Sequence, residues 1–224
     1  MFVGHVALGF VGKTLAPRVS LAWLVLCTQL ADVLWPLFLL TGIEHARIVP
    51  GITAASPLDL YDYPYSHSAG ALLVWSVLAA SPWLYSRRFR EAAVVFGAVF
   101  SHFVLDVISH RPDMPLVPGS TLVFGLGLWN SRVLSLLVEG ALWAVGLAVY
   151  VRATRATSAF GRYGLWALVA LLTAAWLGGM YGPPPPSIRV LALSALVAAA
   201  VLVAWLWFLD ARRPVHAAGV RPDH

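Results

Sequence analysis

The chain alternates between long apolar runs and short connections rich in charges, proline or glycine. Six runs lie near the roughly 20 residues that a helix needs to cross the hydrocarbon core of a membrane. They cover residues 19–41, 66–86, 92–110, 133–150, 165–180 and 190–209, of which 165–180 is the shortest and is Gly-rich at its end. This pattern predicts an all-α, polytopic transmembrane helical bundle with about six spans.

Residues 1–11 form a further apolar run of a different kind. No basic residue precedes it and Lys13 follows it, which reverses the order found in a cleavable signal peptide. At about 1.5 Å per residue, a helix of this length is too short to cross the membrane. We predict a short N-terminal re-entrant helix that turns at Pro17 and brings His5 to a depth similar to that of Asp32.

Composition agrees with a membrane protein. Hydrophobic residues make up 60% of the chain and charged residues 11%, whereas a soluble domain carries about 25% charged residues. The net charge of +5 comes from basic residues that are scattered singly or in short groups. The chain therefore has no basic stripe that would indicate nucleic-acid binding.

The positions of the basic residues favour one orientation. Eleven of the 15 lysines and arginines lie in connections on one side of the predicted membrane, and the other four are Arg47, Arg111, Arg132 and Arg189. The positive-inside rule then places both termini in the cytoplasm. We expect one integral membrane domain over residues 1–224, with the polar site in 1–150, two further spans in 151–210 and a cytoplasmic tail in 211–224.

Three ionisable residues share one face of the third span. His102, Asp106 and His110 stand four residues apart, and each step of four turns about 40° around a helix. Each such group at membrane depth costs roughly 2.5–3.5 kcal/mol on insertion scales. Imidazoles and a carboxylate at this spacing are suitable metal ligands. The stripe predicts a buried metal site, although His110 also fits a solvated histidine at a helix end.

His5, Asp32, His67 and Glu139 also interrupt apolar sequence, and each has a simpler interpretation. His5 fits a satisfied polar residue, Asp32 a helix-packing carboxylate and Glu139 a buried carboxyl bonded to backbone. His67 fits an incidental neighbour of a helix-capping Ser66. A catalytic zinc needs three protein ligands and an open position. The number of candidates therefore predicts either two ions or supporting residues around one ion.

The outer loop ahead of His67 is dense in hydrogen-bonding groups, including Asp59, Asp62 and Tyr63. Its acids, like Glu44 and Asp113 in the outer loops, fit solvated residues, but the loop could also form the mouth of the site. The sequence contains no His-Glu-x-x-His, Gly-x-Ser-x-Gly, Walker A or Gly-x-Gly-x-x-Gly motif. Zincin proteases, serine hydrolases and nucleotide-driven pumps therefore lose support.

The order of these motifs resembles the YdjM-type family of bacterial inner-membrane proteins, which are described as metal-dependent hydrolases. The likeness covers roughly residues 1–150 and is carried by Gly-His at 4–5, Ala-Asp-Val-Leu-Trp-Pro at 31–36, Asp-Tyr-Pro-Tyr-Ser-His-Ser at 62–68 and Ser-His-x-x-x-Asp within 101–113. Many members have a second acid where this chain has Leu34, and an arginine near Tyr63 or Pro64. A more remote similarity to zinc phospholipases C suggests phosphoester chemistry.

Carried over residue by residue, the resemblance implies a metal site, to which the helical spacing adds His110. The implied ligands are His5, Asp32, His67, His102 and Asp106. We expect one or two divalent ions, with Zn²⁺ as the first choice. Glu139 or a non-ligating acid such as Asp62 would shuttle the proton. The substrate would be a membrane lipid or lipid-linked ester, phosphoester or amide reached from the outer leaflet.

Two alternatives use the same residues. A transporter could move protons or divalent cations along the His/Asp stripe. A membrane scaffold could hold a structural metal in a closed four-ligand site. The sequence has no obvious inverted repeat, which favours the hydrolase over the transporter.

Overall fold

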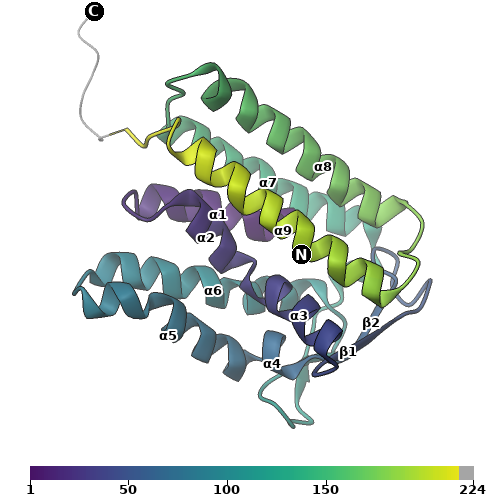
Figure 1. Cartoon of the computed structure of the whole chain (residues 1–224). Helices are drawn as coiled ribbons and strands as arrows, with labels where there is room; N and C mark the ends of the chain where they lie inside the picture. The colour runs from purple at the N-terminus through teal and green to yellow at the C-terminus, as the bar shows by residue number, and fades with distance from the viewer. Residues whose placement is uncertain (217–224) are drawn as a thin grey trace, which may run out of the picture.

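Helices make up most of the chain in the computed structural model, which describes residues 1–216 (Figure 1). Apolar runs form helices at membrane depth because a helix satisfies its own backbone polar groups. The α-helices are α1 Val3–Leu15, α2 Leu21–Thr28, α3 Leu30–Thr41, α4 Pro64–His67, α5 Ala69–Tyr85, α6 Phe89–Ser109, α7 Arg132–Ala153, α8 Leu165–Tyr181 and α9 Ile188–Asp210. The predicted all-α bundle is confirmed, and most of the predicted tail lies outside the described residues.

Two long connections with short strands lie at one end of the bundle, where β1 and β2 are seen (Figure 1). Strands β1 His45–Ile48 and β2 Leu58–Asp62 form an antiparallel ribbon, and β3 Met114–Pro115 pairs with β4 Val123–Phe124. The short helix α4 lies at the same end, and a 3₁₀ turn, η1 Leu128–Asn130, accepts the Ala55 N–H of the β1–β2 connection through the Trp129 carbonyl at 2.9 Å. Pro50, Leu58 and Trp129, from these connections, line the cavity described below.

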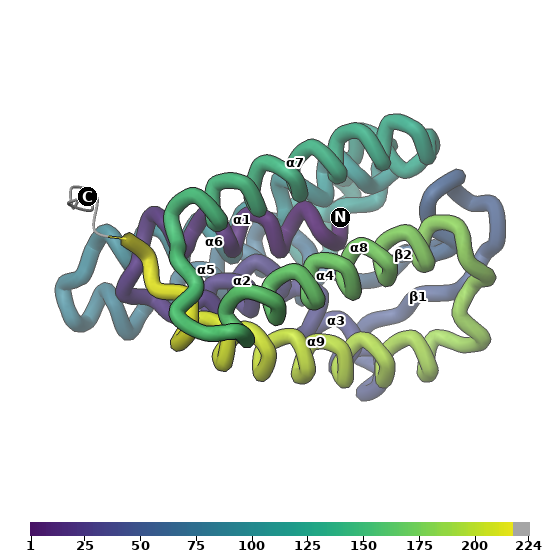
Figure 2. The backbone as a smooth tube through the Cα atoms, turned by 90° about the horizontal axis from the view of Figure 1, so that it is seen from above, coloured from purple at the N-terminus to yellow at the C-terminus, as the bar shows by residue number. Residues whose placement is uncertain are grey.

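Helix α1 lies inside the bundle, in contact with α2, α6 and α7 (Figure 2). Val3, Val6 and Phe10 are fully buried in the core that α1 shares with α7, α8 and α9. The close approach of α1 to α7 depends on Gly146 of α7, because a Cβ at that position would lie 2.7 Å from the carbonyl oxygen of Ala7 on α1. The short helix of 13 residues therefore enters the protein interior, as predicted, and carries His5 into it.

The number of spans is smaller than the six predicted. Within residues 1–216, four helical segments are long and apolar enough to cross a membrane: α6, α7, α9 and the segment Phe160–Tyr181. The last of these joins α8 to a preceding π-helix, η2 Phe160–Gly164, so the run predicted as the shortest is full length. Helix α5 has only 17 residues because Ser68 is extended and separates it from α4. The α2–α3 pair adds a fifth span if it is counted as one.

The chain bends by 59° between α2 and α3, at Gln29, while Pro36 lies within α3. The Thr28 hydroxyl donates to the Val25 carbonyl at 2.9 Å, and such back-bonding by Ser or Thr often bends helices. Broken helices at membrane depth are tolerated where they are buried in protein or line a cavity.

Candidate metal centre

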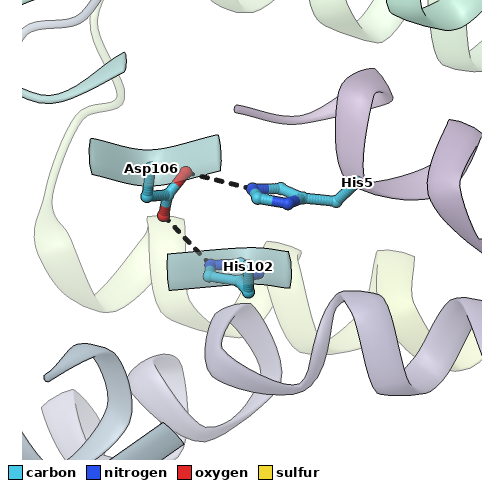
Figure 3. A group of neighbouring side chains, drawn as sticks. All are labelled: His5, His102 and Asp106. Carbon is cyan, nitrogen blue, oxygen red and sulfur yellow. Dashed lines mark hydrogen bonds and ion pairs between the residues drawn. The ribbon is translucent and has the colours of Figure 1, made fainter. Parts of the chain in front are cut away.

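Five of the predicted ligands come together from four helices. His5 lies on α1, Asp32 on α3, His67 on α4, and His102 and Asp106 on α6. Asp106 lies between two imidazoles, 3.0 Å from His5 Nε2 through Oδ1 and 3.0 Å from His102 Nε2 through Oδ2 (Figure 3). The Met1 ammonium also lies 2.5 Å from Asp106 Oδ1. Asp106 is thus the carboxylate around which positive and imidazole groups gather.

A second group of ligand atoms shares His102 with the first. Asp32 Oδ1 lies 3.6 Å from His67 Nε2 and 3.8 Å from His102 Nε2. Asp106 Oδ2 lies 3.9 Å from His67 Nε2. Zinc bonds of about 2.0–2.1 Å at tetrahedral angles separate neighbouring ligand atoms by about 3.3 Å. These separations, together with 3.0 Å between His102 and Asp106, bracket that value, so the residues fit a small divalent cation.

Hydrogen bonding leaves the inward nitrogen of His102 available. Its Nδ1 lies 2.8 Å from the Thr28 carbonyl oxygen at the end of α2, so this nitrogen carries the proton. Its Nε2 is buried and makes no hydrogen bond among the described residues, although Asp106 Oδ2 lies 3.0 Å away. An imidazole that donates from one nitrogen to a backbone carbonyl and presents the other nitrogen is the usual arrangement of a metal-binding histidine.

His67 is held in a similar way by two residues from outside the predicted ligand set. Its Nδ1 lies 2.7 Å from Ser66 Oγ, and the Ser66 hydroxyl donates to Glu44 Oε2 at 2.6 Å. Burial raises the pKa of Glu44 above its usual value, while hydrogen bonds from Ser66 and Tyr65 act in the opposite direction. Glu44, which we predicted to be a solvated loop residue, is only 1% exposed.

His110 is buried at the end of α6 rather than solvated. Its Nε2 lies 3.5 Å from Asp106 Oδ2. Its Nδ1 lies 3.2 Å from both the Tyr63 hydroxyl and Asp113 Oδ1, and its ring stacks at a tilt against Trp129. His110 therefore lies close to the other residues of the stripe, as predicted, and approaches Asp106 Oδ2, whereas His5 approaches Oδ1.

The acids of the ribbon have separate partners. Asp59 accepts hydrogen bonds from Arg47 and Arg111. Burial raises the pKa of Asp59, but these two cations outweigh it and hold that pKa below its usual value. Asp62 lies 2.7 Å from His45 Nδ1 at the exposed surface and is not among the described residues that line the cavity below. Its predicted role in proton transfer is therefore not carried further.

Glu139 anchors the start of α1. Its Oε1 accepts the backbone N–H groups of Phe2 and of Gly4, the latter at 3.2 Å. Its Oε2 accepts the Trp176 indole N–H at 2.9 Å. A carboxylate offers about four lone-pair positions, so Glu139 keeps roughly one for a further proton donor. The carboxyl that had no obvious partner in the sequence is thus bonded to backbone and to α8.

A cavity of about 950 Å³ adjoins this cluster, at the end of the bundle that carries the ribbons. Its polar side is formed by Asp32, His67, Asp106, His110 and Glu139. Trp35, Trp129 and Trp176 contribute aromatic surface, and Pro183–Pro185 with Met180 extend the apolar wall. Helix α8 and the proline-rich connection to α9 therefore help to build the site, whereas the sequence placed the site within residues 1–150.

No protein-family model, curated protein or solved structure matches the chain. The resemblance to the YdjM-type family accordingly stays a prediction from the short motifs. The structure itself has apolar helices able to span a membrane and a buried His/Asp cluster able to hold a metal ion.

Proposed function

We propose that the cluster binds a divalent cation, Zn²⁺ first, and that the protein is a membrane-embedded metal-dependent hydrolase. The convergence of imidazole nitrogens and carboxylate oxygens from α1, α3, α4 and α6 on one wall of a cavity carries this proposal. Imidazole and carboxylate ligands suit zinc. Ionisable side chains are costly to bury in an apolar, membrane-spanning bundle, so a cluster of them indicates a functional site.

Asp32, His67 and His102 are the proposed ligands of the catalytic ion. Asp32 and His67 line the cavity, and the Asp32 side chain is 39% exposed, so this side of the cluster is open to a substrate. His5 and His102 lie deeper, and Asp106 joins them to the open side. A cation bound there would lower the pKa of a coordinated water towards about 7 and polarise the scissile group.

The remaining residues position the substrate and move the proton. Glu139 faces the cavity with about one free lone-pair position, which supports its predicted role as proton acceptor. The Trp residues and the proline wall would pack against an apolar chain. Arg132 at the rim suits an anionic head group. These features support a lipid or lipid-linked ester, phosphoester or amide as the substrate.

The proposed setting is the bacterial inner membrane, with both termini in the cytoplasm. The bias of lysines and arginines supports that orientation, and it places the cavity on the outer side. A lipid would then reach the site from the outer leaflet, in the part of the bundle where Trp129 and the 182–185 connection meet.

Metal analysis combined with a lipid assay tests the proposal. The full chain, purified in detergent and equilibrated with Zn²⁺, should retain at least one ion per chain, and His102→Ala should lose it. Wild type added to vesicles of phosphatidylethanolamine and phosphatidylglycerol should release products detectable by mass spectrometry, and His102→Ala should not. Wild type without bound Zn²⁺ would overturn the metal site. Zn²⁺ flux across vesicles without lipid turnover would replace the hydrolase by a transporter.

A further inference from the structure

A buried chain of three side chains connects the outer loop to His67. Glu44 follows α3, and Ser66 and His67 end α4. Glu44 is 1%, Ser66 0% and His67 4% exposed. The two contacts that link them, 2.6 Å from Ser66 Oγ to Glu44 Oε2 and 2.7 Å from Ser66 Oγ to His67 Nδ1, are short. The direction of these two hydrogen bonds decides which nitrogen of His67 carries the proton.

The other partners of Glu44 fix that direction. Its Oε1 accepts the backbone N–H groups of Tyr65 at 2.7 Å and Ser66 at 2.8 Å. An ionised carboxylate has no proton to donate and can only accept hydrogen bonds. The Ser66 hydroxyl therefore donates its proton to Glu44 Oε2. The Ser66 oxygen then accepts from His67, which places the imidazole proton on Nδ1. The lone pair of His67 Nε2 is left to face Asp32 and Asp106, at 3.6 and 3.9 Å.

Ser66 is not needed to cap the next helix. Ser68 performs that function, because its side chain accepts the Ala71 N–H at 3.1 Å and its backbone is extended. Two serines on either side of His67 therefore have different partners. Ser68 holds α5, and Ser66 holds the imidazole.

We propose that Glu44 and Ser66 are positioning residues that fix the tautomer of His67 and thereby present its Nε2 to the metal. The part of this inference that concerns metal binding rests on the proposed function. The part that concerns the tautomer of His67 applies to the metal-free protein and does not rest on the proposed function.

Glu44→Gln tests the direction of the chain with little change in shape. If the amide oxygen keeps the two backbone N–H groups, the amide NH₂ must face Ser66 and donate to its oxygen. The Ser66 hydroxyl then donates to His67 Nδ1, and the imidazole proton moves to Nε2. Ser66→Ala removes the link altogether. Ser68→Ala is the matched control, because it removes the cap of α5 and leaves the Glu44–Ser66–His67 chain intact.

The tautomer can be measured directly in the metal-free full chain. Nitrogen NMR of ¹⁵N-histidine-labelled protein in detergent, with His67→Asn to assign the resonance, should report Nδ1–H for wild type and for Ser68→Ala. It should report Nε2–H for Glu44→Gln. An Nε2–H tautomer of His67 in wild type, or an unchanged tautomer in Glu44→Gln, would overturn the inference.

Zn²⁺ affinity, measured by competition with a chelator, provides the second readout. Removing an outer partner of a ligating histidine commonly weakens metal affinity 10–100-fold, and we expect that loss for Glu44→Gln and Ser66→Ala. Ser68→Ala should unfold at a lower temperature with unchanged affinity. Equal affinity in all four proteins would overturn the inference while leaving the metal site in place. A wild type that binds no Zn²⁺ would instead count against the proposed function, and the NMR result would still decide the tautomer.

Discussion

His102 is the most informative residue to remove, because both groups of candidate ligand atoms include it. The side chain is fully buried, donates to the Thr28 carbonyl and presents its second nitrogen 3.0 Å from Asp106. His102→Ala should therefore have two separable effects. One is a fixed loss of stability, and the other is the loss of stabilisation by metal.

The metal-dependent effect follows from mass action. A ligand present at 100 times its dissociation constant stabilises the folded state by about 2.7 kcal/mol. For a chain of this size, each kcal/mol shifts the melting temperature by roughly 2–4 °C. Zn²⁺ should thus raise the melting temperature of wild type by roughly 5–11 °C and leave that of His102→Ala unchanged. The fixed effect of leaving the Thr28 carbonyl without its donor is about 1–3 kcal/mol.

Leu206→Ala separates the two effects. Leu206 is fully buried in the core on α9 and is not part of either group of candidate ligands. Its truncation should reduce stability by about 2–5 kcal/mol and keep the full shift with Zn²⁺. Thermal unfolding of the three proteins in detergent, with and without Zn²⁺, measures both quantities. An equal Zn²⁺ shift in wild type and His102→Ala would refute the reasoning, because the ion would then bind without the shared ligand.

Other contacts predict smaller and more specific effects. Gly146→Ala should destabilise the fold by about 1–3 kcal/mol and weaken Zn²⁺ binding, because its Cβ would press on Ala7 of α1. Gly97→Ala has open space and should do neither in the same unfolding and titration measurements. Glu139→Gln should lower turnover of the phospholipid vesicles about 10²–10⁴-fold with Zn²⁺ content unchanged; unchanged turnover would contradict its proton role. Asp59, with its lowered pKa, stabilises the fold fully above its unfolded pKa of about 3.9, and this stability is lost as the pH falls towards the folded value. Asp59→Asn should therefore unfold with a weaker acid dependence than wild type.

Which residues share one face of a helix could be predicted from the sequence with little ambiguity. His102 and Asp106 must share a face of α6 because four residues are close to one turn, and their cost in an apolar segment indicated a paired, buried role. The burial of α1 was also predictable, because a helix of 13 residues is too short to span. Both inferences depend on local geometry, which a single sequence determines.

The partners that orient these ligands could not be predicted in this way. Glu44 and His67 are separated by more than 20 residues, and they meet only because the β1–β2 ribbon returns the chain to the end of α3. The Thr28 carbonyl reaches His102 beside the bend at Gln29, and no motif in the sequence predicted a bend at that residue. Trp176, from a segment marked only as apolar, completes the bonds of Glu139. Each of these contacts depends on tertiary packing.

The site forms where helices are interrupted. The break between α2 and α3 supplies the Thr28 carbonyl to His102, and the extended Ser68 that separates α4 from α5 leaves His67 at a helix end. His110 ends α6, and the first N–H groups of α1 are satisfied by Glu139. Interrupted backbone at membrane depth exposes polar groups, which are tolerated only where protein or a cavity satisfies them. The helix breaks and the polar side chains therefore stabilise each other. A substitution that extended one of these helices through its break should disturb the cluster even if every candidate ligand were kept.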